Sequence, residues 1–410
     1  MRALMSLVAG LWLAAAAAPV AAQTPPDNDT CLMCHLDPAA TRANGTSVAV
    51  APDHFGESVH GIFSCVDCHE DLAATEEWPH AESLARVSCQ TCHDESVSNF
   101  EKSVHFALRE RATGRAGATC VDCHGTHDIK PSSDPSSRTY VLNLPQTCGT
   151  CHSHQQIPGP GGEVFEHFQD SVHGRGLSRS GLTVSANCSS CHGAHDVRAP
   201  EDPESRVHRS QIAGTCATCH QGIDQVYEES VHGRTVAGGN LGAAVCSDCH
   251  TSHEILRSET EAWRLDAVRE CGTCHVDKIG TYRDTYHGKV TALGFTRIAT
   301  CADCHGSHDI LPASNPQSMI SSTRLVSTCQ SCHPGANENF VKYDPHADKH
   351  DPERSPALYW SARFMQLLLA GVFLFFGAHT LLWFPRSLAE RRAHRRAGAA
   401  SGDRTPPAEE

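Results

Sequence analysis

All 22 cysteines of this 410-residue chain belong to one motif, Cys-x-x-Cys-His, which occurs eleven times. Its cysteine pairs are Cys31 and Cys34, Cys65 and Cys68, Cys89 and Cys92, Cys120 and Cys123, Cys148 and Cys151, Cys188 and Cys191, Cys216 and Cys219, Cys246 and Cys249, Cys271 and Cys274, Cys301 and Cys304, and Cys329 and Cys332. Structural zinc needs four ligands and does not explain a histidine after every second cysteine. A disulfide framework places no histidine at a fixed offset either. The motif is the attachment sequence of c-type haem, and it predicts eleven covalent haems.

Each motif histidine is the expected proximal ligand of one haem iron, because it directly follows the cysteine that anchors the porphyrin. These residues are His35, His69, His93, His124, His152, His192, His220, His250, His275, His305 and His333. Aromatic residues make up only 6% of the chain. A chain that devotes about 30 residues to each haem cannot build an ordinary apolar core, so the haems themselves are expected to form it.

The motifs alternate between two kinds. Four copies extend to Cys-x-x-Cys-His-x-x-His, and between a plain motif and the next extended one lies Ser-Val-His or a relative of it. This period predicts an array of two-haem modules. The expected fold is mainly α, with much irregular loop, one haem-packed array and one C-terminal transmembrane helix.

The repeat elements supply one further histidine for each expected haem, which makes bis-histidine ligation the favoured arrangement. The distal candidates are His60, His80, His105, His127, His173, His195, His232, His253, His287, His308 and His346. Methionine cannot serve generally, because only Met319 lies free of the signal, the motifs and the membrane segment. Iron with two histidines lacks the thioether that raises the potential, so low potentials are expected. His350 competes with His346 for the last position.

The two ends of the chain indicate export and anchoring. Residues 1–22 read as a cleavable signal peptide. The apolar segment Met365–Phe384 is long enough to cross a bilayer and has aromatic residues at both ends. Several arginines follow it, so residues 356–385 are expected to form a transmembrane helix and residues 386–410 a basic, disordered cytoplasmic tail. The haem region is then expected on the periplasmic side of the cytoplasmic membrane.

From about residue 31 to 350, the motifs resemble those of multihaem c-type cytochromes. The doubled Cys-x-x-Cys-His pattern is similar to class III and NapC/NirT-type cytochromes, which pass electrons from quinol or a cytochrome b to periplasmic reductases. The resemblance implies that the second histidine of an extended motif ligates a neighbouring haem. NapC-type proteins carry an N-terminal anchor and about four haems, and the C-terminal anchor here departs from that pattern.

Electron transfer is the leading hypothesis for function, since irons with both axial positions filled do not bind substrate. The expected partners are an integral-membrane cytochrome b or quinol-oxidising subunit and a periplasmic redox protein. The net charge of −14 argues against nucleic acid. The alternative is a multihaem reductase of nitrite, hydroxylamine or a sulfur oxyanion with one open haem. His379 lies inside the membrane segment and is a candidate quinone or b-haem contact, or a neutral histidine bonded across a helix interface.

The sequence also suggests a division of the haem region. Five motifs fall in residues 23–158 and six in residues 159–355. Gly159–Gly162 lie between them in a short glycine-rich stretch, which is typical of a turn or hinge.

Overall fold

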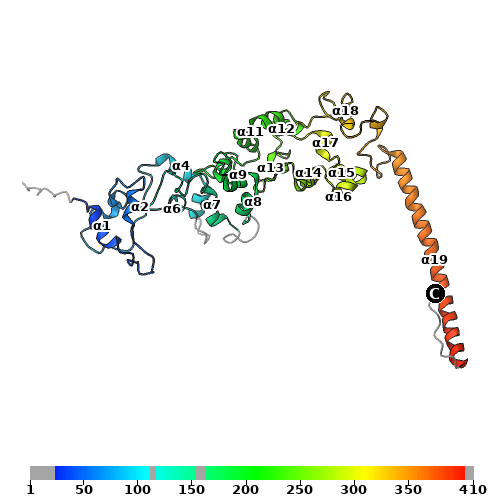
Figure 1. Cartoon of the computed structure of the whole chain (residues 1–410), viewed down its shortest axis with the longest axis horizontal. Helices are drawn as coiled ribbons and strands as arrows, with labels where there is room; N and C mark the ends of the chain where they lie inside the picture. The colour runs from blue at the N-terminus through cyan, green and yellow to red at the C-terminus, as the bar shows by residue number, and fades with distance from the viewer. Residues whose placement is uncertain (1–23, 111–116, 154–161, 402–410) are drawn as a thin grey trace, which may run out of the picture. The chain divides into compact units, whose positions relative to one another are not determined.

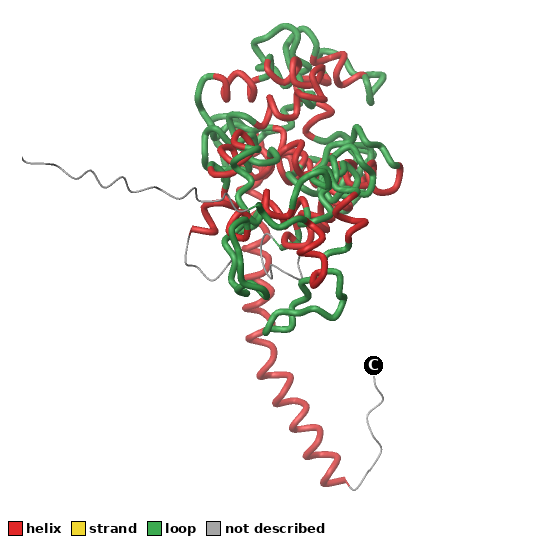
Figure 2. The backbone as a smooth tube through the Cα atoms, turned by 90° about the vertical axis from the view of Figure 1, so that its left-hand side faces the viewer, coloured by secondary structure: helices red, strands yellow, loops and turns green. Residues whose placement is uncertain are grey.

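The computed structural model describes residues 24–110, 117–153 and 162–401 of the chain (Figure 1). The predicted signal peptide, most of Gly159–Gly162 and residues 402–410 lie outside these ranges. Short helices joined by long loops make up the described part, which contains no named strand (Figure 2). The predicted fold class is confirmed in this respect: the protein is mainly helical, with much loop and one long apolar C-terminal helix.

The helices fall into three kinds: those that carry the motifs, those that lie between them and the C-terminal helix. In chain order they are α1 (Asn28–His35), α2 (Pro52–Gly56), α3 (Cys65–Cys68), η1 (Glu70–Leu72), α4 (Asp94–Glu101), α5 (Val104–Glu110), α6 (Cys120–His124), α7 (Leu144–His152), α8 (Val164–Asp170), α9 (Val172–Ser180), α10 (Cys188–His192), α11 (Ile212–Glu228), α12 (Val231–Ala237), α13 (Cys246–His250), α14 (Glu261–Cys274), α15 (Val276–Asp284), α16 (Tyr286–Ala292), α17 (Cys301–His305), α18 (Leu325–Gln330), η2 (Phe340–Lys342) and α19 (Pro356–Ser401).

The chain divides into two compact units at a different place from the one the sequence suggested. The first comprises residues 1–225 and 235–257, and the second residues 226–234 and 258–410. The predicted boundary between residues 158 and 159 therefore falls inside the first unit. Contacts cross that boundary: the Val104 N–H donates to Val197 O at 2.9 Å, and the His124 and His195 rings lie 6.0 Å apart. A glycine-rich stretch alone does not separate segments that are tied together on both sides.

Four of the five Ser-Val-His elements start a helix, at Val104, Val172, Val231 and Tyr286, and a serine or threonine caps the first turn. Ser171 Oγ accepts the Gly174 N–H at 3.0 Å at the start of α9, and Thr285 Oγ accepts the Gly288 N–H at 3.1 Å at the start of α16. The glycine after the histidine is also required in α9, α12 and α16. A Cβ at Gly288 would collide with the Tyr282 carbonyl of the preceding helix. The element thus fixes its histidine on a capped first turn, pressed against the helix before it.

Four of the five even-numbered motifs have an aspartate before the second cysteine, and this aspartate caps the motif helix. Asp122, Asp248 and Asp303 accept the backbone N–H of the residue before the first cysteine, each at 2.7 Å. Asp67 does the same for α3. The carboxylate therefore sets the start of the turn that presents both thiols and the histidine.

One backbone hydrogen bond recurs between distant copies of the repeat. The valine of a Ser-Val-His element donates its N–H to a carbonyl just beyond an extended motif, as in Val59 to Ile129 O (2.9 Å), Val104 to Val197 O (2.9 Å), Val172 to Ile255 O (2.8 Å) and Val231 to Ile310 O (2.9 Å). Every such bond closes a long loop. The modules are therefore interleaved rather than independent.

The polypeptide itself buries very little apolar surface. The buried hydrophobic side chains among the described residues are Val66, Leu177, Val245, Val268, Tyr282 and Ala336, and the buried polar ones are mostly serine and threonine. A domain of this length would ordinarily bury many more large apolar side chains. This composition of the interior agrees with an array in which prosthetic groups supply the core.

The C-terminal helix α19 is long and apolar enough to cross a membrane, and the apolar window is not buried against the rest of the protein (Figure 1). It extends beyond the predicted span, through Pro385 and the basic segment, to Ser401. The prediction of a disordered tail is therefore wrong for residues 386–401. Alanine, arginine and glutamate are strong helix formers, and Arg386 pairs with Glu390 at 3.4 Å one turn later.

Candidate haem-binding sites

The structure brings predicted proximal and distal histidines together in ten pairs. Their ring centroids are separated by 6.0 to 6.4 Å: His35 and His80 (6.0 Å), His60 and His93 (6.0 Å), His69 and His127 (6.4 Å), His105 and His152 (6.1 Å), His124 and His195 (6.0 Å), His173 and His220 (6.2 Å), His192 and His253 (6.0 Å), His232 and His275 (6.2 Å), His287 and His333 (6.0 Å), and His305 and His346 (6.2 Å). We name each site by its motif histidine.

This separation fits one metal ion held between two imidazoles. A metal–nitrogen bond of about 2.0 Å, with about 1.1 Å more from the nitrogen to the ring centroid, gives about 6.2 Å for two rings on opposite sides of an ion. Two rings in direct stacking contact would lie closer, at about 4 Å. The residues present therefore fit an iron with two axial histidines.

The pairs follow a regular scheme that spacing alone did not show. A plain-motif histidine faces the Ser-Val-His histidine that precedes it in the chain, as His220 faces His173. An extended-motif histidine faces the second histidine of a later motif, as His192 faces His253. The second histidine of an extended motif thus lies at another motif's site, in line with what the resemblance implies.

At the two ends of the array the repeat is irregular, and His80 and His346 take the places of the missing repeat histidines. His80, from Trp-Pro-His, faces His35, and the Trp78 ring lies 6.0 Å from the His80 ring. His346 faces His305. Two members of the predicted set are not among the ten pairs. They are His250, which ends α13 in the first unit, and His308, which follows α17 in the second.

Burial keeps many of these imidazoles neutral. Desolvation lowers the pKa of ten of them below the ordinary value, and for most the paired histidine adds to the effect: His69, His105, His124, His127, His173, His192, His253, His287, His305 and His346. Only a neutral imidazole has the free lone pair that binds iron, so the environment favours the form that ligates.

Hydrogen bonds at Nδ1 orient several rings. His35 Nδ1 lies 2.7 Å from Val48 O, and His80 Nδ1 lies 2.8 Å from Ala81 O. A carbonyl oxygen only accepts, so each Nδ1 carries the proton and each Nε2 keeps its lone pair. Both histidines of the His35 site are therefore in the tautomer that iron requires.

The cysteines show that neighbouring sites follow one another in sequence order within each unit. First cysteines of consecutive motifs lie close enough for one thiol to raise the pKa of the other in the pairs Cys31 and Cys65, Cys89 and Cys120, Cys148 and Cys188, Cys216 and Cys246, and Cys271 and Cys301. Second cysteines interact in the alternate pairs Cys68 and Cys92, Cys123 and Cys151, Cys191 and Cys219, and Cys304 and Cys332. Within each unit, consecutive attachment sites therefore lie next to one another.

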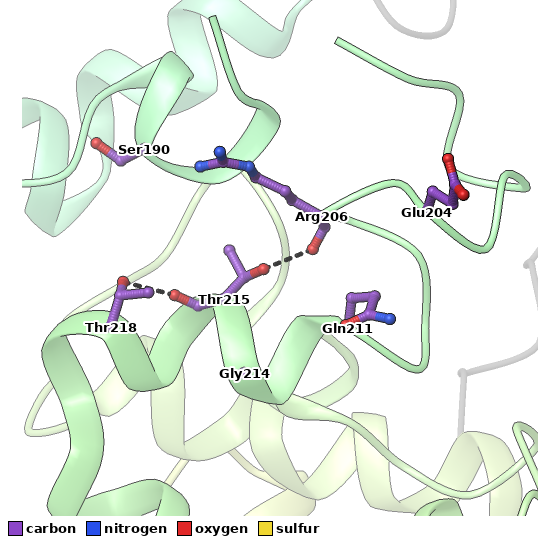
Figure 3. A pocket seen from close by; sticks show the side chains of 7 residues that line it. All are labelled: Ser190, Glu204, Arg206, Gln211, Gly214, Thr215 and Thr218. Carbon is purple, nitrogen blue, oxygen red and sulfur yellow. Dashed lines mark hydrogen bonds between the residues drawn. The ribbon is translucent and has the colours of Figure 1, made fainter. Parts of the chain in front are cut away.

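A polar pocket of about 250 Å³ lies beside the motif at Cys216 (Figure 3). Ser190, Arg206, Thr215 and Thr218 are among its lining residues. Thr215 donates its hydroxyl to Arg206 O at 2.7 Å, and Thr218 donates to Thr215 O at 2.8 Å (Figure 3). Thr215 thus ties the motif helix to the loop before it, and the lining offers no ligand of the predicted set.

Two features of the sites were not recognised in the sequence. The aspartate caps of the motif helices were visible as Asp before the second cysteine, but their role needed the backbone geometry. The assignment of each distal histidine to a particular iron needed the fold, because the partners lie tens of residues apart.

A search of curated proteins finds a C-type polyheme cytochrome of Geobacter sulfurreducens, OmcC. It is 25% identical over 217 residues, which cover 45% of this chain and 25% of the relative. The chain thus matches only about a quarter of that relative's length. No family model and no solved structure matches the chain. The match to this relative, the cysteine pairs and the paired histidines together indicate that the chain is similar to multihaem c-type cytochromes.

Proposed function

We propose that the protein is a membrane-anchored, periplasmic electron carrier with eleven covalently bound c-type haems, each ligated by two histidines. The observation that carries the proposal is the set of ten histidine pairs with centroids 6.0 to 6.4 Å apart. Bound haem iron supplies reversible one-electron chemistry at low potential. His250 and His308 complete the proposed ligand set, which is the one expected from the sequence.

Within each unit, the chain's own residues hold the sites in sequence order. Each motif supplies two cysteines for attachment and one histidine, and a second segment supplies the other histidine. Alternating contacts of first and second cysteines run from motif to motif within each unit. This arrangement supports stepwise transfer from one site to the next, because neighbouring attachment points abut.

The alternative of a reductase is less well supported. A reductase of nitrite, hydroxylamine or a sulfur oxyanion needs an iron with one axial position free for substrate. Each of the ten sites described above has two facing histidines, the irregular His35 and His305 sites included. Outer-sphere transfer is therefore the function that this geometry favours.

We propose an integral-membrane cytochrome b or quinol-oxidising subunit as the donor or acceptor at the anchored end. Helix α19 supports this because its apolar surface is not covered by the rest of the described chain. His379 lies within the apolar stretch of α19, where an ionisable side chain is costly and marks a functional contact. We assign it to a quinone or b-haem contact with that partner.

We propose a cationic redox protein as the periplasmic partner at the N-terminal end. Residues 24–101 contain fourteen acidic residues and two basic ones. Their net charge is therefore −12, compared with −14 for the whole chain. All fourteen acidic residues are exposed. Exposed large apolar side chains lie among them, including Met33 and Trp78, close to the His35 site. An apolar contact ringed by acidic groups fits a partner of opposite charge.

Electron exchange with a small basic c-type cytochrome should therefore depend on salt. We expect the second-order rate constant to fall at least about tenfold between low ionic strength and 0.5 M salt, because screening removes the long-range attraction. The triple variant Glu70→Gln, Glu76→Gln, Glu77→Gln should lose most of this dependence. The control Glu228→Gln, Glu229→Gln, Glu254→Gln changes the charge equally and should retain it. Equal salt dependence in the two triple variants would contradict the proposed docking region. Stopped-flow absorbance gives the rates.

The proposed function is tested by haem quantification and low-temperature EPR of the oxidised protein. We expect eleven haems per chain and low-spin ferric signals only, since every iron has two histidines. In His253→Ala the iron at His192 loses its second ligand, so a high-spin signal of about one iron in eleven should appear. His208→Ala is the control, because His208 bonds to Ser210 Oγ at 2.7 Å instead of facing a motif histidine. A stoichiometric high-spin signal in the unmodified protein would favour the reductase instead.

A further inference from the structure

The turn that carries His346 lies directly before the membrane helix. Asp344 Oδ1 accepts the His346 N–H at 2.8 Å, and Asp344 Oδ2 binds Arg354 at 2.9 Å. Ser355 Oγ accepts the Asp348 N–H at 3.2 Å, and α19 begins at the next residue, Pro356. The segment Asp344–Ser355, which we call the anchor turn, therefore joins the His305 site to the membrane helix through a closed set of hydrogen bonds.

The anchor turn is also fixed to α15. Lys349 Nζ bonds to Asp284 Oδ2 at 2.9 Å, at the C-terminal end of that helix. One turn earlier on the same helix, Thr281 Oγ lies 3.0 Å from His346 Nδ1. Two contacts thus place the histidine against α15, one through the Lys349 side chain of the anchor turn and one through the imidazole ring itself.

The hydrogen bonds of Thr281 favour one of the two nitrogens of His346 as the one that carries the proton. Thr281 Oγ lies 3.0 Å from Lys278 O and 3.3 Å from Asp277 O, and both carbonyls only accept. The single hydroxyl proton therefore goes to the helix backbone, and the oxygen lone pair faces His346. This arrangement favours donation from His346 Nδ1 to Thr281 Oγ, which leaves the His346 Nε2 lone pair free. That ring lies 6.2 Å from the His305 ring.

His350 has no comparable arrangement. It lies in the same anchor turn, and its backbone N–H donates to Asp348 Oδ1 at 2.8 Å. His350 is exposed, whereas His346 is half-buried. The two rivals left open by the sequence are thus distinguished by their neighbours.

We propose that Thr281 is a positioning residue that selects His346, and not His350, as the second axial ligand of the iron at His305. The inference rests on the proposed function, since it assumes a haem at the motif Cys301–His305. Thr281 acts through His346: it fixes the ring orientation and the tautomer, and it supplies the acceptor that keeps the imidazole a strong donor to iron. Through the anchor turn, the same ligand is linked to the start of the membrane helix.

The test compares Thr281→Val with Thr281→Ser in the complete, haem-loaded protein. Valine keeps the shape of the side chain but removes the acceptor, while serine keeps it. We expect Thr281→Val to shift one low-spin EPR component, or to convert about one iron in eleven to high spin, and to raise the reduction potential of one titrating component. Thr281→Ser should match the unmodified protein. A Thr281→Val protein with unchanged EPR and redox titration would overturn the proposal.

The ligand choice is tested separately with His346→Ala and His350→Ala. The first should produce a high-spin signal of about one iron in eleven, and the second should leave the spectrum unchanged; the reverse result overturns the inference. Mass spectrometry of the peptide that contains Cys301 and Cys304 shows whether haem is attached there. A peptide without haem in the unmodified protein would refute the proposed haem at this site, which is a different failure from a loaded site that ignores Thr281.

Discussion

Replacing Cys188 and Cys191 with serine is expected to lower the haem content from eleven to ten and to reduce the yield of folded protein severely. This motif takes part in two sites. Its first histidine, His192, faces His253, and its second histidine, His195, faces His124 at another site. Loss of its haem leaves two half-buried imidazoles without an iron and removes part of the core. Loss of a bound metal group belongs to the changes that cost more than about 4 kcal/mol.

The first motif is the matched control for this experiment. Its histidine, His35, faces His80, and the motif has no second histidine of its own that serves another site. The variant Cys31→Ser, Cys34→Ser should therefore also lose one haem but keep much more folded protein. Haem per chain and the yield of exported protein are the measurements. Equal yields from the two variants would show that the interleaving of modules does not stabilise the fold.

Replacing His379 with alanine is expected to abolish reduction by quinol in membranes while leaving chemical reduction by dithionite unchanged. The imidazole lies in the apolar part of α19, and a contact with a quinone or b-haem of a partner subunit would be lost with it. Thr380→Ala is the control, because the Thr380 hydroxyl donates to Phe376 O of its own helix at 2.8 Å and needs no partner. Unchanged quinol-dependent reduction in His379→Ala would remove the functional role.

The local chemistry of the sites was readable from the sequence. Attachment cysteines and motif histidines are covalently adjacent, so their spacing carries the information directly, and the balance of eleven further histidines pointed to bis-histidine ligation. The mainly helical fold and the apolar C-terminal helix followed from the repeat and from the 20 apolar residues of the span. In each case a short stretch of chain contains all the residues involved.

Other features could not be predicted because they depend on contacts between distant segments. Nothing in the spacing tells that His192 faces His253, or that the boundary near residue 158 is bridged by Val104 and Val197. The helical continuation of α19 to Ser401 was missed for a different reason. Its basic composition was read as a solvated tail, although the same residues are good helix formers.

The sequence by itself predicted where the proposed haems attach and which histidines are available to hold them. Only the tertiary structure decided which histidine faces which: the His346 ring lies 6.2 Å from the His305 ring, and Thr281 Oγ lies 3.0 Å from His346 Nδ1. The physical reason is that attachment is fixed by neighbouring residues in the chain. The second axial position is filled by whatever imidazole the folded modules bring to within about 6 Å of the first, with its proton on the far nitrogen.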